Sequence, residues 1–155
     1  MRAAIFPGSF DPFTLGHWDI GCRALGLVDK LYVAVGSNIH KRGLLSPEAR
    51  VALIRDCFAD DARVEVLAYD GLTVDLCGRL GVKALVHGVR SFADFEYERQ
   101  IAEVNGRLDV ETENIFLLAS PGNASVSSSA VRELIEHGAD ASLFLPEGVD
   151  LRRYL

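Results

Sequence analysis

Residues 3–17 read AAIFPGSFDPFTLGH, and this stretch decides the fold of the chain. It opens with a short apolar run, residues 3–6, of the kind that forms a buried strand, and Pro7-Gly8 ends that run. Two prolines and two glycines within residues 6–17, Pro7, Gly8, Pro12 and Gly16, fix an unusual backbone path up to the helix that begins at Gly16. This strand, loop and helix are the first unit of a pattern that continues along the chain.

Apolar runs rich in β-forming residues alternate with helical patterns over the whole sequence. The runs predicted as strands are residues 3–6, 31–35, 63–67, 84–86 and 115–119. Four of these five runs are almost continuously apolar, which indicates parallel strands covered on both faces. The helices between them are predicted over residues 16–27, 46–58, 72–80, 92–108 and 127–137, with one or two short helices in residues 141–155. Ser46-Pro47-Glu48 is a start signal for the second helix.

This alternation, with no linker or break in composition, predicts an α/β fold: a single doubly wound, Rossmann-like domain with a five-stranded parallel sheet. The domain should span residues 1–155. In such folds, ligands bind beyond the carboxyl ends of the strands, at the point where the strand order reverses. Functional residues are therefore expected after Phe6, Val35, Val86 and Ala119.

Composition excludes several classes of protein. The chain has 155 residues, of which 49% are hydrophobic and 25% charged, so disordered and low-complexity classes do not fit. A formal net charge of −6 argues against nucleic acid or an anionic membrane as a partner, although a local cationic pocket for a small anion is compatible with it. The cysteines, Cys22, Cys57 and Cys77, lack zinc spacing and are expected as buried side chains on helices. With no signal peptide or apolar span in view, we expect a cytoplasmic location.

The loop after the first strand ends at His17, in the first turn of the predicted helix. Free N–H groups and the helix dipole favour an anion at that position, and Gly16 lets a ligand approach the main chain closely. A histidine there can donate a hydrogen bond to a phosphate oxygen. The alternative is a turn in which the histidine caps nothing. The loop is neither a Walker A loop nor a Gly-x-Gly-x-x-Gly dinucleotide loop.

A second candidate ligand-binding loop follows the fifth predicted strand. It runs from Ser120 to Arg132, and three serines in succession open the next helix, with Arg132 one turn later. Hydroxyls and N–H groups at a helix N-terminus, backed by an arginine, can bind a polyphosphate. The alternative is that the serines only cap the helix, with more hydroxyls than a cap needs, and that the Arg132 side chain is solvated. The two loops together favour a nucleotide site more strongly than either does alone.

Four motifs in order along nearly the whole chain resemble those of the bacterial phosphopantetheine adenylyltransferases, a branch of the nucleotidyltransferase superfamily. They are Ser9-Phe10-Asp11-Pro12 with Thr14-x-Gly16-His17, Gly88-x-Arg90, Asp94-Phe95-Glu96-Tyr97-Glu98, and Ser127-Ser128-Ser129-x-x-Arg132. The Thr-x-Gly-His form of the first motif is typical of this branch, whereas other branches usually carry His-x-Gly-His.

The resemblance implies transfer of the adenylyl group of ATP to 4′-phosphopantetheine, with Mg²⁺ accompanying ATP, to give dephospho-coenzyme A and pyrophosphate. It implies that His17 stabilises the transition state, that Lys41 binds phosphate near the reacting centre and that Ser9 touches both substrates. It places Phe10 against the nucleotide and Thr73 on the pantetheine group. The remaining ATP-binding positions that it implies are Gly88, Val89, Arg90, Glu98, Asn123, Ala124, Ser125, Val126, Ser127, Ser128, Ser129 and Arg132. No metal ligand among the protein side chains is implied.

The physical chemistry of the transfer agrees with these positions. The step needs in-line positioning and charge stabilisation more than a general base, because the attacking phosphate oxygen is already ionised near neutrality. Lys41, Arg90 and His17 are expected to supply the cations that orient two phosphorylated substrates in an acidic protein. As a ribose ligand, Glu98 would offer acceptors to hydroxyl groups.

His87 departs from the family pattern, which usually has arginine or lysine directly before Gly88. We expect His87 to take over as a ligand of the pantetheine phosphate. The alternative is a partly buried histidine at a strand end.

Two other functions compete with this interpretation. One is nucleotidyl transfer to another phosphorylated acceptor, such as nicotinamide mononucleotide or glycerol 3-phosphate, which the Thr14-x-Gly16-His17 form disfavours. The other is a nucleotide-binding sensor or scaffold without catalysis, which the presence of both His17 and Lys41 disfavours. The resemblance also implies a homohexamer built from trimers and feedback inhibition by coenzyme A.

Overall fold

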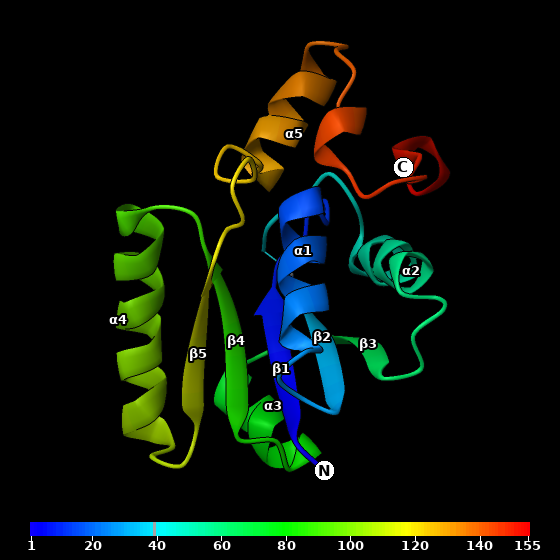
Figure 1. Cartoon of the computed structure of the whole chain (residues 1–155). Coiled ribbons are helices and arrows are strands. Elements are labelled where there is room, and N and C mark those ends of the chain that lie inside the picture. The colour runs from blue at the N-terminus through cyan, green and yellow to red at the C-terminus, as the bar shows by residue number, and fades with distance from the viewer. Residues whose placement is uncertain (39) are drawn as a thin grey trace.

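The computed structural model describes residues 1–38 and 40–155. Its centre is a parallel five-stranded sheet in the order β3-β2-β1-β4-β5 (Figure 1). The strands are β1 (Ala3–Gly8), β2 (Lys30–Gly36), β3 (Val64–Tyr69), β4 (Ala84–Val89) and β5 (Glu113–Leu118). The order reverses between β1 and β4, so the predicted doubly wound α/β fold is confirmed.

One α-helix follows each strand. The helices are α1 (Leu15–Ala24), α2 (Pro47–Cys57), α3 (Thr73–Leu80), α4 (Phe92–Leu108) and α5 (Ser128–Glu136), followed by the short 3-10 helices η1 (Ser142–Phe144) and η2 (Leu151–Arg153). The start signal read at Ser46 is confirmed, since its side chain accepts a hydrogen bond from the Ala49 N–H and Pro47 opens the helix. Gly81 ends α3 in the left-handed conformation, at φ 65°.

Alternate residues of β1 enter two separate cores, one on each face of the sheet. Ala4 and Phe6 belong to the larger core, which includes residues of α1, α2 and α5 and of the C-terminal segment. Ile5 points the other way and packs with Leu76 and Cys77 of α3. Figure 1 shows α1 in front of the sheet and α3 behind it. Burial on both faces explains why the inner strands are continuously apolar.

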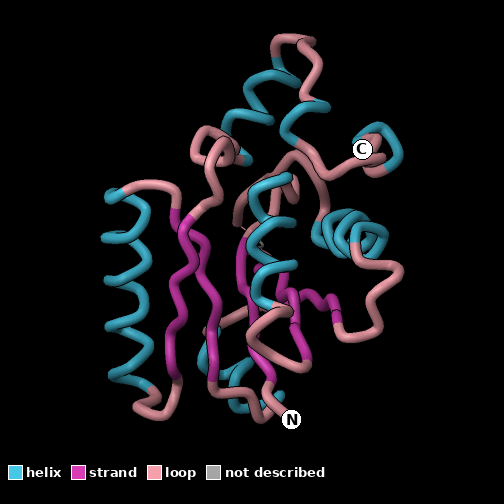
Figure 2. Tube along the Cα trace, in the orientation of Figure 1, coloured by secondary structure: helices cyan, strands magenta, loops and turns pink. Residues whose placement is uncertain are grey.

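The carboxyl ends of β1 and β4, the parallel strands between which the order reverses, lie at the same end of the sheet. β1 pairs with β2 along the whole of Ala3–Gly8, whereas its register with β4 is a single pair, Ile5 with Leu85. The loops that follow the strands gather at this end of the sheet, below α5 (Figure 2). This is the edge at which ligands bind in open parallel sheets.

Several predicted boundaries are corrected by the structure. β1 continues through Pro7 and Gly8 because pairing with β2 persists there. The first helix ends at Ala24 rather than Leu27, and β3 covers residues 64–69 rather than 63–67. The edge strands β3 and β5 are only partly buried, so the expectation of full coverage holds for the inner strands alone.

The cysteines follow the prediction in part. All three are free and lie on helices, but only Cys77 is buried, while Cys22 and Cys57 are half-buried.

In the described parts of the chain, no helix combines the length and the apolar character needed to cross a membrane.

Candidate active site

Two cavities lie at the carboxyl edge of the sheet. The larger, of about 940 Å³, is lined by the end of β2, the loop before α2, part of the loop after β1, and α5; its lining includes Ser9, Lys41 and Arg132. The smaller, of about 200 Å³, is lined by the start of α1, the end of β4 and the loop into α5; its lining includes His17, Arg90 and Ser129. Most of the predicted site residues thus divide between these two cavities.

His17 lines the smaller cavity, and Thr14 fixes its ring. The Thr14 N–H donates to Nδ1 of His17 at 3.0 Å, and the Thr14 hydroxyl lies 3.1 Å from the same nitrogen. Since a backbone N–H can only donate, Nδ1 carries no proton, and the proton of the neutral ring is assigned to Nε2. His17 therefore caps the start of α1 and keeps a donor for a ligand, so the alternative in which it caps nothing is wrong.

The surroundings of His17 keep its ring uncharged. Three phenylalanines surround the ring, with centroids 6.4 Å (Phe6), 5.0 Å (Phe10) and 5.5 Å (Phe13) away. Burial among them, and secondarily the positive charge of Arg90, lowers the pKa of His17 to about 4. With its pKa lowered in this way, His17 would act near neutrality as a neutral hydrogen-bond donor rather than as the cation expected from the sequence, and its part in catalysis stays a prediction.

Phe10 lies elsewhere than expected. Its ring is 3% exposed and packs edge-on against Phe6 and Phe13. Phe10 is outside the lining of both cavities, so the packing disfavours the expected contact of its side chain with the nucleotide, and that contact stays a prediction. The backbone of Phe10 is strained, with φ at 51°, a region that non-glycine residues rarely occupy.

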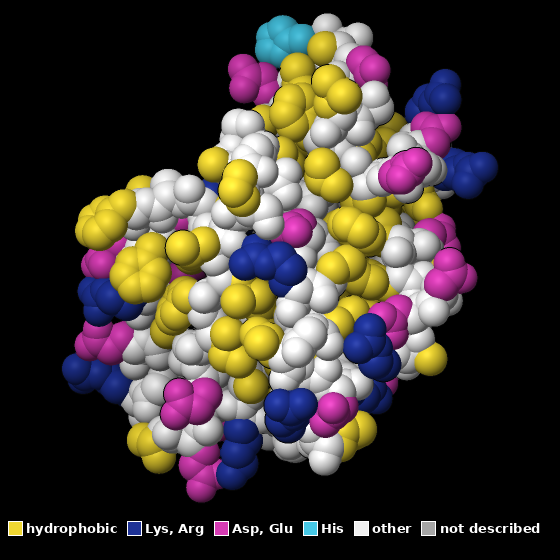
Figure 3. Space-filling view, in the orientation of Figure 1, with side chains coloured by type: hydrophobic (Ala, Val, Ile, Leu, Met, Phe, Trp, Pro, Cys, Tyr) yellow, Lys and Arg dark blue, Asp and Glu magenta, His cyan; other side chains and the backbone are white. Residues whose placement is uncertain are grey.

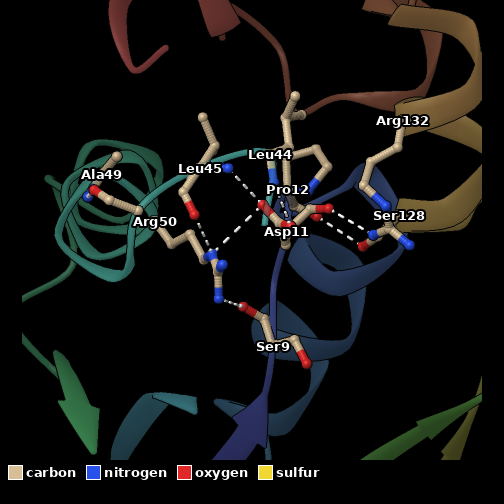
Figure 4. Close-up of polar contacts among 10 residues, drawn as sticks. Ser9, Asp11, Pro12, Leu44, Leu45, Ala49, Arg50, Ser128 and Arg132 are labelled. Carbon is tan, nitrogen blue, oxygen red and sulfur yellow. Dashed lines mark hydrogen bonds and ion pairs between the residues drawn. The ribbon is translucent and has the colours of Figure 1, made fainter. Parts of the chain in front are cut away.

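Helix α5 is tied to the loop after β1. Ser127 is the N-cap of the helix, with its hydroxyl accepting from the Ala130 N–H. The Ser128 hydroxyl donates to the Pro12 carbonyl at 2.8 Å, and Arg132 Nη1 donates to the Asp11 carbonyl at 2.8 Å (Figure 4). Two of the groups predicted to bind phosphate therefore also join the two loops to each other.

A buried ion pair that sequence reasoning missed lies beside these contacts. Arg50 Nε is 3.4 Å from Asp11 Oδ1, and the two side chains are 9% and 10% exposed. Figure 4 shows Arg50 reaching from α2 toward the loop that carries Asp11. The residues are 39 positions apart, so no local spacing signals the pair. A charged residue inside a loop with two prolines was the one available hint.

The structure brings together only some of the residues that the resemblance implies for binding 4′-phosphopantetheine. Ser9 and Lys41 line the larger cavity from opposite loops. Thr73 opens α3, where its hydroxyl is 2.9 Å from the Tyr69 hydroxyl, and it is outside the lining of both cavities.

His87 and Glu98 contact each other instead of facing a cavity. His87 Nδ1 is 3.1 Å from Glu98 Oε2, and Nε2 is 2.8 Å from Asn114 Oδ1. The ring also stacks on Phe116 and is nearly fully buried. Both nitrogens of His87 have partners between β4, α4 and β5, an arrangement that disfavours the expected role as a phosphate ligand, and that role stays a prediction. Glu98, expected on the ribose, is held in the same cluster.

Most other predicted ATP-binding positions do meet at the smaller cavity. Its lining holds Gly88, Val89, Arg90, Asn123, Val126, Ser127, Ser128 and Ser129. Ala124 and Ser125 belong to the same loop but not to the lining. Gly88 packs closely on α1, since a Cβ there would lie 3.0 Å from the Ile20 side chain.

Within residues 1–38 and 40–155, no three His, Cys, Asp or Glu side chains are grouped so that they could hold a metal ion. The Asp11 carboxylate at the larger cavity already accepts two backbone N–H groups besides facing Arg50. Mg²⁺ usually keeps several waters and binds through substrate phosphates, so a magnesium ion carried by ATP fits this donor set without a protein cage.

Comparison with known proteins shows the family of the chain. Residues 5–134 match the family model described as cytidylyltransferase-like. A phosphopantetheine adenylyltransferase of Flavobacterium psychrophilum is 46% identical over 98% of this chain and 100% of its own length. The chain belongs to the phosphopantetheine adenylyltransferase family. Enzymes of the same name from Phocaeicola vulgatus and Lachnoclostridium phytofermentans are 45% and 43% identical over 97% and 96% of this chain, and these matches cover 99% and 91% of their own lengths.

Membership in the phosphopantetheine adenylyltransferase family confirms the resemblance drawn from the four motifs, and it makes the chain a nucleotidyltransferase. The individual site residues stay predictions. Geometry supports His17, Ser9 and Lys41 as cavity residues, and it places Phe10, His87 and Glu98 in other surroundings.

Proposed function

We propose that this chain transfers the adenylyl group of ATP to 4′-phosphopantetheine, forming dephospho-coenzyme A and pyrophosphate in coenzyme A biosynthesis. The observation that carries the proposal is the full-length similarity to relatives of that name. Under this proposal residues 1–155 act as one nucleotidyltransferase domain in the cytoplasm.

The two cavities would divide the substrates between them. The smaller one, with Arg90, Asn123 and the serines that open α5, would take ATP. The larger one, with Ser9 and Lys41, would take the phosphate end of the acceptor. Mg²⁺ would enter with ATP and neutralise part of the charge on its phosphates.

In the transfer step, a phosphate oxygen of the acceptor attacks the α-phosphorus of ATP, and the bond to the β-phosphate breaks to release pyrophosphate. A phosphate monoester carries its second negative charge near neutrality, so no protein base is needed. His17 Nε2–H would donate to a non-bridging oxygen of the α-phosphate, where negative charge grows in the transition state. The contact from the Thr14 N–H to Nδ1 would orient the His17 ring, and with it the Nε2–H donor, before the substrate binds.

Incubation of the purified chain with ATP, Mg²⁺ and 4′-phosphopantetheine tests the proposal, with pyrophosphate release and dephospho-coenzyme A as readouts. Nicotinamide mononucleotide and glycerol 3-phosphate serve as competing acceptors. Faster turnover with either of them would overturn the assignment of the acceptor, and no turnover with any acceptor would favour a nucleotide-binding protein without catalysis.

Assembly and regulation are further parts of the proposal. The family resemblance favours a homohexamer, with coenzyme A binding at the active site as a feedback inhibitor.

A further inference from the structure

The buried pair of Asp11 and Arg50 at the edge of the larger cavity has no role in the transfer described above. Burying two charges costs desolvation energy that their attraction repays only when the geometry is good, so such a pair is a weak source of stability. It does supply a fixed geometry between the segments that carry the two charges.

The carboxylate of Asp11 holds the loop that carries Lys41. Its two oxygens accept the N–H groups of Leu44 and Leu45, each at 2.8 Å (Figure 4). These residues follow Lys41 by three and four positions. Gly43, between them and Lys41, has its main chain so close to the pair that a Cβ would lie 2.6 Å from Asp11 Oδ2. The loop is therefore packed directly onto the carboxylate.

The guanidinium of Arg50 holds the other side of the same cavity. Its Nε donates to the Leu45 carbonyl at 3.0 Å, and its Nη1 donates to the Ser9 carbonyl at 3.3 Å. One side chain thus bridges the Lys41 loop and the loop that carries Ser9. The planar guanidinium can do this because it offers several donors in a fixed arrangement, whereas a lysine has one nitrogen at the end of a flexible stem.

We propose that Asp11 and Arg50 are positioning residues that set the distance between Ser9 and Lys41 for the phosphate of the acceptor. The inference rests on the proposed function, since it assigns the larger cavity to 4′-phosphopantetheine. The smaller cavity is tied to the same loop through Ser128, whose hydroxyl donates to the Pro12 carbonyl, and substitution of the Asp11 or Arg50 side chain leaves that carbonyl in place. Loss of the pair therefore affects the acceptor and spares ATP.

The test compares Arg50→Lys and Asp11→Asn with Arg55→Lys as a matched control. Arg55 lies one and a half turns further along α2 and donates to the Val66 carbonyl at 3.0 Å, away from both ligand cavities. In the two test variants we expect KM for 4′-phosphopantetheine to rise roughly tenfold or more, because a small misplacement of a reacting group has effects of this size. KM for ATP should change by less than about twofold. Arg55→Lys should change neither constant.

A second measurement requires no substrate. Hydrogen exchange of the Leu44 and Leu45 amides should become faster in Asp11→Asn and stay unchanged in Arg55→Lys. Arg50→Lys keeps the charge, so it carries the kinetic test if Asp11→Asn does not fold.

The inference would be overturned if both KM values rose equally or if neither rose. It would also be overturned if Arg55→Lys raised KM for 4′-phosphopantetheine without raising KM for ATP, or if exchange at Leu44 and Leu45 were unchanged in Asp11→Asn. These outcomes differ from failure of the proposed function, which would appear as a wild-type chain without turnover.

Discussion

The imidazole of His17 is held neutral by its surroundings and aimed by Thr14, so its substitution should affect the rate more than binding. For His17→Ala we expect kcat to fall about 10²–10³-fold, the usual cost of losing one donor to a developing charge. The dissociation constant for ATP, measured by calorimetry, should change much less. A variant with nearly normal kcat would remove His17 from the mechanism.

The lowered pKa of His17 also predicts how stability depends on pH. The pKa falls from 6.5 to about 4 on folding, so between those values the unfolded chain binds more protons than the folded one. The stability linked to a neutral His17 is fully present above about pH 6.5 and is lost as the pH falls toward 4. Denaturant unfolding should show wild type losing more stability than His17→Gln between pH 7 and 4.5. Parallel curves for the two proteins would contradict this prediction.

At the scale of elements, His87 joins β4 to α4 and β5 through Glu98 and Asn114. His87→Ala leaves both partners without their buried contact, so we expect a loss of about 1–3 kcal/mol in the free energy of unfolding. Asn114→Ala, the matched variant, should cost a similar amount. KM for 4′-phosphopantetheine in His87→Ala should stay close to wild type at both pH 6.5 and 8.5. A rise in that KM, larger at the lower pH, would restore His87 as a phosphate ligand.

The elements differ in how far they could be predicted from sequence. The bounds of α4, residues 92–108, were predicted correctly because the signals that delimit a helix are local: Ser91 caps its start and the helical pattern stops at Leu108. The cap formed by Thr14 and His17 is equally local, and a capping pattern three residues apart could have found it. By contrast, the contacts of His87 and the pair of Asp11 with Arg50 join residues distant in sequence, and they follow only from the order of the strands.

At the scale of the whole molecule, α4 presents apolar side chains to solvent. Tyr97, Val104 and Leu108 are 65%, 59% and 58% exposed, and their spacing places them on one side of the helix. Figure 3 shows further hydrophobic side chains over the N-terminal end of α4. A monomer rarely leaves such a surface uncovered, and the proposed hexamer would cover it with other copies of the chain.

Sedimentation velocity should therefore give wild type a mass about six times that of one chain, as the family resemblance implies for closed assemblies of this kind. Val104→Glu places a charge in the apolar stripe, so we expect smaller species with an unchanged circular dichroism spectrum. Arg107→Glu is the control and should leave the assembly intact: it also introduces a glutamate on α4, at an exposed side chain that pairs with Glu103 at 3.6 Å. A monomeric wild type would contradict the hexamer, whereas an intact Val104→Glu hexamer would contradict only the role of α4, because the subunits would then meet through another surface.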